Sequence, residues 1–117
     1  MLPKVINTQD LEEQIQEKII YKNLLLQINK DFQLIGIDFN CDINTSFDVF
    51  FQSFKELIKD IINSDFELFL NLLYRIDLDE TKIRNIIQSE NDDLYAVLSF
   101  EILKREWQKV WFRNYYS

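Results

Sequence analysis

The sequence predicts an all-α protein, a compact bundle of about five helices with an extended connection at residues 35–44. Three observations carry this prediction. Gly and Pro occur once each, too rarely for the many tight turns of an all-β fold. Apolar residues recur at spacings of three and four along most of the chain, which is the period of an amphipathic helix. The chain has 117 residues, 47% of them hydrophobic, so we expect residues 1–117 to form a single helical domain.

The first elements are predicted from a change of pattern near residue 10. Residues 1–9 have no hydrophobic period, and we expect them to be a loose N-terminal arm. A long helix is expected over residues 11–34, with Asp10 as its N-cap and Glu13 in capping-box position. It should end at Gly36, the one glycine, which readily adopts the left-handed conformation after a helix. Its apolar positions are Leu11, Ile15, Ile19, Tyr21, Leu24, Leu25, Ile28 and Phe32.

Residues 35–44 break the helical period. Apolar and polar residues alternate there, which is typical of a half-buried strand. The chain has one such stretch, and a strand without a partner leaves its backbone groups unpaired. We therefore expect an extended connection that lies over the helices and fills a groove with its apolar side chains. The alternative is a strand that pairs with a second copy of the chain.

The next two helices are predicted from caps and periodicity. Thr45 is the expected N-cap of a second helix, with Asp48 three residues later. Ser64 and Glu67 form a capping box that ends the second helix and begins a third at residues 66–76. This third helix is apolar on most sides, so we expect it to be the central helix of the bundle.

Two further helices complete the predicted fold. Asp77 with Glu80 repeats the cap signature and begins a short fourth helix. The polar run at residues 89–93 interrupts the pattern, and Asp92 or Asp93 is the expected cap of a fifth helix that continues to the C-terminus.

Charge and hydropathy exclude several kinds of partner. The chain has 20 acidic and 13 basic residues, a net charge of −7, which repels nucleic-acid phosphates and anionic lipid headgroups. We expect neither a nucleic acid nor a membrane as partner. The longest apolar runs are far shorter than the roughly 20 residues of a membrane-spanning helix, and no signal-peptide pattern is visible. With a single cysteine, Cys41, which fits a reducing compartment, we expect a cytoplasmic protein.

The residue types present leave little for catalysis. The chain has no histidine and one glycine, which excludes Ser-His-Asp triads, imidazole metal ligands and Gly-rich phosphate loops. Acidic residues gather at 77–80 and 92–93, where helices are expected to begin and carboxylates serve as caps. We therefore expect no enzymatic activity and no cofactor, and no small-molecule substrate can be identified.

One alternation of oxygen-bearing residues resembles a calcium-binding loop. Asp38, Asn40 and Asp42 occupy what would be positions one, three and five of an EF-hand. The sixth position should be glycine and is Ile43, and the twelfth should be glutamate and is Val49. We therefore expect no metal site here, and interpret these residues as the solvent-facing side of the extended segment.

The C-terminal stretch is the most unusual part of the sequence. Residues 104–117 carry four basic and one acidic side chain, a net charge of +3, so residues 1–103 carry −10. Stacking on single-stranded bases and insertion at a membrane surface are disfavoured because the acidic body repels both. We expect Trp107 to cover the core, Trp111 to do so as well, and the last turn to contact a partner. The candidate interface is Trp111, Phe112, Arg113, Tyr115 and Tyr116.

These observations predict a non-catalytic, acidic helical module that binds another protein and self-associates, in a pathway that the sequence does not name. No motif in the residues assigns the chain to a named family. The alternative is an acidic inhibitor that mimics phosphates and binds a basic surface of another protein. That alternative requires the acidic residues to gather on one continuous face, whereas an interface anchored by aromatic rings does not.

Overall fold

The computed structural model describes residues 2–116, and of Tyr116 the backbone only. Within that range the chain forms six α-helices and no strand, which confirms the all-α prediction. The radius of gyration is 13.6 Å, close to the roughly 13 Å expected for a compact chain of this length. The helices are α1 (Thr8–Gln14), α2 (Lys18–Gln33), α3 (Phe47–Ser64), α4 (Phe66–Arg75), α5 (Glu80–Gln88) and α6 (Leu94–Tyr116).

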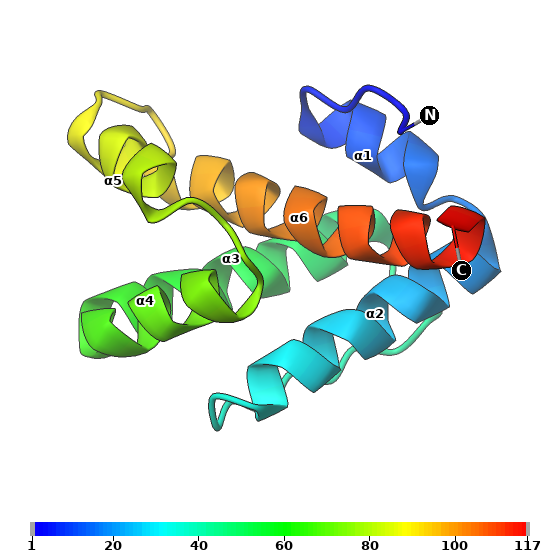
Figure 1. Cartoon of the computed structure of the whole chain (residues 1–117), viewed down its shortest axis with the longest axis horizontal. Helices are drawn as coiled ribbons and strands as arrows, with labels where there is room; N and C mark the ends of the chain where they lie inside the picture. Colours follow the sequence, from blue (N-terminus) through cyan, green and yellow to red (C-terminus); the bar gives the residue numbers. More distant parts are fainter. Residues whose placement is uncertain (1, 117) are drawn as a thin grey trace.

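The central helix is α6, which crosses the middle of the molecule and contacts α2, α3 and α5 (Figure 1). Every side chain from Leu94 to Trp111 is buried or half-buried. The expectation that the helix at residues 66–76 is central is therefore wrong. That helix, α4, leaves Tyr74 88% exposed. With 10 residues against the 23 of α6, it is too short to be enclosed on all sides.

The predicted helix at residues 11–34 is two helices, because the chain turns between α1 and α2. Ile15 ends α1, and its backbone N–H donates to the carbonyls of Leu11 and Glu12. Neither Gly nor Pro stands at the break, so the local sequence gives no sign of it. Leu11 and Ile15 are both buried in the same core as Tyr21 of α2. The turn therefore follows from tertiary packing, which brings the apolar side chains of both helices into the core.

The described part of the N-terminal segment is attached to the body. Val5 is buried in the core, and α1 begins at Thr8. The side chain of Asn7 accepts a hydrogen bond from the Asp10 backbone N–H at 2.8 Å, and Asp10 Oδ2 accepts one from the Ile6 N–H at 3.1 Å. This pair resembles a capping box, except that Asp10 accepts from Ile6, the residue before the N-cap, instead of from Asn7 itself. It places the N-cap three residues before Asp10, the residue expected to provide it.

The other caps lie within two residues of their predicted places. Ser46 caps α3 in place of Thr45, and Asp65 caps α4 in place of Ser64. Asp93, which was predicted as a cap, accepts a hydrogen bond from the Ala96 backbone N–H at 3.1 Å. In each case the oxygen acceptor precedes the helix by one residue and satisfies an otherwise unpaired N–H.

Asp77 has a different role from the predicted one. Asp79 caps α5, and Asp77 adopts a left-handed conformation (φ 59°) after α4. The Leu78 N–H then reaches back to the Leu73 carbonyl at 2.9 Å, as in a Schellman motif. Gly36 (φ 82°) ends α2 in the same way, as predicted.

Residues 35–44 form the predicted extended connection. Burial alternates residue by residue along it, so the two-residue period of the sequence is reproduced without a strand. Phe39 is its most buried side chain, and its ring centroid lies 6.3 Å from that of Phe32 and 5.6 Å from that of Phe54. The connection therefore fills a groove between α2 and α3, and its polar residues face outward.

Candidate functional site

The candidate interface lies at the end of α6, where burial falls off from one turn to the next. Trp107 and Trp111 are buried, the latter 9% exposed, and belong to the core as expected. Phe112 is 42% exposed and Tyr115 65%. The side chain of Tyr116 lies outside the described part of the chain. A contact between the last turn and a partner stays a prediction.

The rings at this end form a continuous cluster from core to surface. The Tyr115 ring stacks on Trp111, with centroids 4.7 Å apart and an interplanar angle of 30°. The Phe112 ring meets Trp111 edge to face at 5.4 Å. Both arrangements are favourable for aromatic pairs. The indole of Trp111 thus supports the two more exposed rings from below.

A groove of about 340 Å³ runs beside these rings. Trp107, Trp111 and Tyr115 of α6 line one part of it, and residues at the α1–α2 junction line the rest. Figure 1 shows the end of α6 close to that junction. Beyond the three rings, the lining residues are Pro3, Glu13, Gln14, Gln16, Glu17 and Ile20.

The α1–α2 junction carries four charged side chains that sequence reasoning did not select. Glu13 and Glu17 line the groove, while Lys18 and Lys22 line a separate depression with Ile19 and Ile43. All four charged residues are exposed. Within the described residues, none of them makes a hydrogen bond or an ion pair through its side chain. On a helix surface such charges look like ordinary solvated residues, so only the place of Glu13 and Glu17 beside the aromatic groove distinguishes that pair.

A second polar cluster is buried between α2 and α6. Lys109 Nζ lies 2.9 Å from Asp31 Oδ2 and 3.6 Å from Glu106 Oε1. Gln27 Nε2 donates to Asp31 Oδ2 at 2.9 Å, and the guanidinium of Arg113 donates to Gln27 Oε1. The network therefore anchors Arg113, one of the candidate interface residues, to α2.

Glu106 is the unusual member of this network. It is completely buried, and neither of its carboxyl oxygens accepts a hydrogen bond within the described part of the chain. Burial, reinforced by the neighbouring Asp31, raises the pKa of Glu106 to about 9. Glu106 is therefore protonated at neutral pH and has a hydrogen-bond donor to offer to Asp31.

Asp31 responds in the opposite direction. Burial by itself opposes its ionisation, but the neighbouring Glu106 and the hydrogen bonds from Lys109 and Gln27 outweigh burial and lower its pKa. The two carboxyl groups thus hold one proton between them over the neutral range. Because Glu106 is fully buried, no substrate reaches this pair, and the cluster joins α2 to α6.

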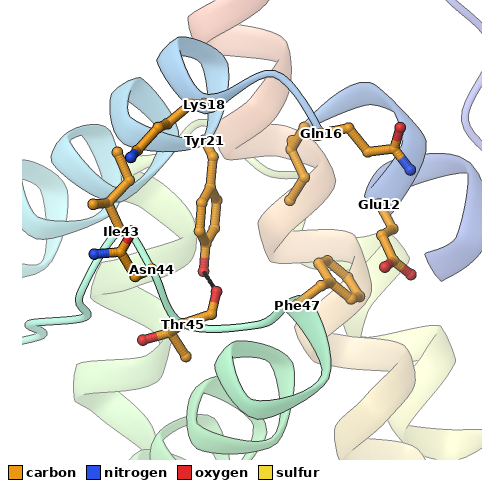
Figure 2. Close-up of a pocket in the computed structure, with 9 residues that line it drawn as sticks. Glu12, Gln16, Lys18, Tyr21, Ile43, Asn44, Thr45 and Phe47 are labelled. Carbon is orange, nitrogen blue, oxygen red and sulfur yellow. Dashed lines mark hydrogen bonds between the residues drawn. The ribbon is translucent and has the colours of Figure 1, made fainter.

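A third feature lies where the extended connection meets α3. A pocket of about 370 Å³ opens there, and the Tyr21 hydroxyl donates to the Thr45 carbonyl at 3.2 Å (Figure 2). Burial raises the pKa of Tyr21, so its hydroxyl keeps its proton and this hydrogen bond. Figure 2 shows Glu12 and Phe47 on one side of the pocket and Lys18 and Ile43 on the other. The bond fastens the end of the connection to α2.

The alternating residues that resemble a calcium loop face solvent. Asp38, Asn40, Asp42 and Asn44 are all exposed. Asp42 Oδ1 accepts a hydrogen bond from the Asn44 backbone N–H at 2.7 Å, which is a local turn. Among residues 2–116, no group of three or more possible ligand side chains is placed to hold a metal ion.

Comparison of the chain with protein-family models, curated proteins and solved structures finds no match in any of the three. Within the described residues, no helix has both the length and the apolar character needed to cross a membrane. Functional inference therefore depends on the surface at the end of α6 and the α1–α2 junction.

Proposed function

We propose that the protein is a non-catalytic protein-interaction domain that binds a second copy of itself through the end of α6. The observation that carries this proposal is the graded exposure of the aromatic cluster. Phe112 and Tyr115 are largely exposed, yet both rings pack on the buried Trp111. Tyr, Trp and Arg are enriched at interface hot spots, where rings supported by a packed neighbour lose little freedom on binding.

Covering the exposed rings of Phe112 and Tyr115 with a partner is energetically favourable. Burial of apolar surface contributes about 25 cal/mol per Å², and Tyr115 keeps most of its surface in contact with water. Arg113 is held by Gln27, so the backbone at this end of α6 is already positioned. A partner that covers the last turn therefore gains apolar contact without first ordering the helix.

The non-catalytic part of the proposal is supported by where the ionisable groups lie. The one strongly perturbed carboxyl pair, Asp31 with Glu106, is enclosed between helices. With no histidine in the chain, the remaining candidates for proton transfer are carboxylates, and several of those serve as caps. For the compartment we propose the cytoplasm, in keeping with the single free thiol of Cys41.

The phosphate-mimic alternative receives less support. It requires carboxylates that are free to face a basic partner from one continuous surface. Four aspartates instead accept hydrogen bonds from backbone N–H groups at the starts of four different helices. They are Asp10, Asp65, Asp79 and Asp93.

The test is the molar mass in solution, measured by size-exclusion chromatography with light scattering. The full chain is expected to give twice the monomer mass at tens of micromolar, the range in which about 8 kcal/mol of association energy acts. Truncation after Trp111 and the single change Tyr115→Ala should both shift the mass toward the monomer.

Tyr74→Ala is the matched control, because Tyr74 is equally an exposed helical tyrosine but lies on α4. It should leave the mass unchanged. Circular dichroism checks that each variant keeps its helices. The proposal is contradicted if the full chain is monomeric at every concentration. It is also contradicted if neither the truncation after Trp111 nor Tyr115→Ala changes the mass of the dimer.

A further inference from the structure

The groove between the α1–α2 junction and the end of α6 combines two kinds of lining. The aromatic rings of Trp107, Trp111 and Tyr115 line it from α6, and the carboxylates of Glu13 and Glu17 line it from the junction. Among the described residues, no lysine or arginine lines it. Such a lining attracts a cation, because the face of an aromatic ring is electrostatically negative and a carboxylate carries a full negative charge.

The two carboxylates have no cation of their own. Within residues 2–116, the side chains of Glu13 and Glu17 form no ion pair and no hydrogen bond. Lys109 and Arg113, the cations of α6 closest in sequence to the three rings, are both held by side chains of α2. A cationic group that enters the groove therefore meets carboxylates that no contacting side chain has already neutralised.

Tyr115 is the ring best placed to meet such a group. One face of its ring stacks on Trp111, and most of the residue is exposed, so the opposite face is open to a ligand. Trp107 and Trp111 are buried in the core and support the exposed ring. Because the ring is held in place before a ligand arrives, binding loses little side-chain freedom.

A guanidinium group has the chemistry that this lining favours. It is planar, stacks on aromatic faces and donates forked hydrogen bonds to carboxylates. It is also more weakly hydrated than an ammonium group, so it leaves water more readily. A metal ion fits less well, because no three possible ligand side chains of the described residues lie together. Phosphate groups are repelled by the two glutamates.

The groove has room for one arginine side chain, and another protein is its expected source. The volume of about 340 Å³ is at the lower end of the range of about 300–1,000 Å³ for ligand sites. Arg75 of a second copy lies on α4, so its entry would require a head-to-tail contact, which forms rings or filaments instead of a two-fold dimer. The other three arginines of the chain bind groups of their own molecule. They are Arg84, Arg105 and Arg113.

We propose that the groove binds an arginine side chain of another protein, whose guanidinium stacks on Tyr115 and pairs with Glu13 and Glu17. A single chain provides every residue of this site. The inference therefore goes beyond the proposed self-association and does not rest on it. Because both would use Tyr115, an arginine-bearing partner and a second copy compete for this ring.

Tryptophan fluorescence reports on the groove directly, because Trp107 and Trp111 are the two tryptophans of the chain and both line it. The probe is N-acetyl-L-arginine amide, titrated into the full chain at about 1 μM, well below the concentration at which the dimer is expected. We expect a saturable change with a dissociation constant in the millimolar range. N-acetyl-L-citrulline amide, which has the same shape without the charge, should bind at least about tenfold more weakly.

Two variants should weaken binding of the arginine amide. Glu13→Gln with Glu17→Gln removes both charges at constant size and should raise the dissociation constant at least about tenfold. Tyr115→Leu removes the aromatic face and should raise it about threefold. The control, Glu12→Gln with Glu90→Gln, changes the net charge as much as the first variant. Because Glu12 lines the separate pocket of Figure 2 and Glu90 follows α5, it should bind like the natural chain. Circular dichroism checks that each variant keeps its helices.

Four outcomes would overturn the inference. The first is the absence of a saturable change with the arginine amide, and the second is an equal affinity for the citrulline amide. The third is an unchanged affinity when Glu13 and Glu17 are both replaced, which would place the site elsewhere. The fourth is a dimer of the natural chain that Arg75→Gln abolishes, which would make a second copy the source of the arginine. A chain that is monomeric at every concentration removes the proposed self-association and leaves this inference in place.

Discussion

The two longest neighbours of α6 pack against it through opposite kinds of chemistry. α3 carries buried apolar side chains such as Ile58, and its ion pair with the residue just before α6, Lys55 to Asp93 at 2.8 Å, lies at the edge of the contact. α2 supplies apolar residues too, but it also places Asp31 and Gln27 in the interior, where they meet Glu106 and Lys109.

The two helix–helix contacts, here called the α3–α6 seam and the α2–α6 seam, differ in how their stability responds to pH. Apolar burial between α3 and α6 has no titratable group, so its contribution is insensitive to pH near neutrality. The α2–α6 seam contains a carboxyl group that is protonated when folded and ionised when unfolded. Its stability must therefore depend on pH through proton uptake on folding. The contact of α6 with α3 combines apolar packing with an ion pair at its edge, whereas the contact with α2 also needs a proton.

The largest expected effect comes from removing an apolar side chain of α3 that packs on α2 and on the extended connection. Phe54 is completely buried, and its ring packs on those of Phe32 and Phe39. Phe54→Ala leaves a cavity and should lower the free energy of unfolding by about 3–5 kcal/mol. Urea denaturation measures this loss at pH 5 and again at pH 8. The loss should be the same at both, and a pH-dependent loss would show that the packing of Phe54 is coupled to the polar network between α2 and α6.

Glu106→Gln should have the next largest effect, and only above acidic pH. Since the pKa of Glu106 is about 9 when folded, against an ordinary value of 4.5, folding takes up a proton at pH values between these two. The free energy of unfolding of the natural chain then falls by up to about 1.4 kcal/mol per pH unit as pH rises. Glutamine imitates the protonated acid and removes this fall.

When the free energy of unfolding is plotted against pH, the curves of the natural chain and of Glu106→Gln should coincide near pH 4 and diverge as pH rises. By pH 8 the variant should be the more stable of the two, by up to about 5 kcal/mol. Asp31 acts at the acidic end, because its lowered pKa contributes stability that is lost as pH falls below its ordinary value of 3.8. Chemical denaturation between pH 3 and pH 9 measures both curves. Parallel curves would mean that Glu106 is ionised in the folded protein.

The smallest effect is expected from Gln27→Met. This change tests how much the uncharged Gln27 contributes to the stability of the polar network between α2 and α6. The change removes the donor to Asp31 and the acceptor for Arg113, while Lys109 still pairs with Asp31. Loss of such bonds should lower the free energy of unfolding by about 1 kcal/mol. For a domain of this size, that corresponds to a fall of about 4 °C in the thermal midpoint.

Gln52→Met is its matched control, because the Gln52 amide donates to Glu56 on the exposed surface of α3. It should leave the midpoint unchanged. Equal shifts in the two variants would show that burial of Gln27 adds nothing to its hydrogen bonds.

Much of the fold follows from local pattern. Spacings of three and four residues predict the helices, and the alternation at residues 35–44 predicts the extended connection, because both periods report which side chains share a face. The caps were placed within three residues, since the side chains of Asp, Asn and Ser accept hydrogen bonds from the N–H groups just after them. The burial of Trp107 and Trp111 follows from their spacing of four.

The candidate site was only partly predictable. Tyr115 and Phe112 were selected for their residue type and position near the chain end, and the structure places them beside Trp111. Glu13 was predicted as a capping-box residue and not as part of the interface, and Glu17 was not selected, since a charge on a helix surface looks like any solvated residue. Their place in the groove depends on the turn between α1 and α2.

The sequence by itself determined the helical class, the extended connection and the aromatic end of the last helix, because periodicity and capping act within a few residues. Only the tertiary structure decided that α6 is central, that the first helix breaks, and that Glu106 keeps a proton. Each of these depends on residues far apart in the chain, such as Asp31 with Glu106 and Lys109. Burial of a charge is a property of the assembled neighbours, which no local pattern encodes.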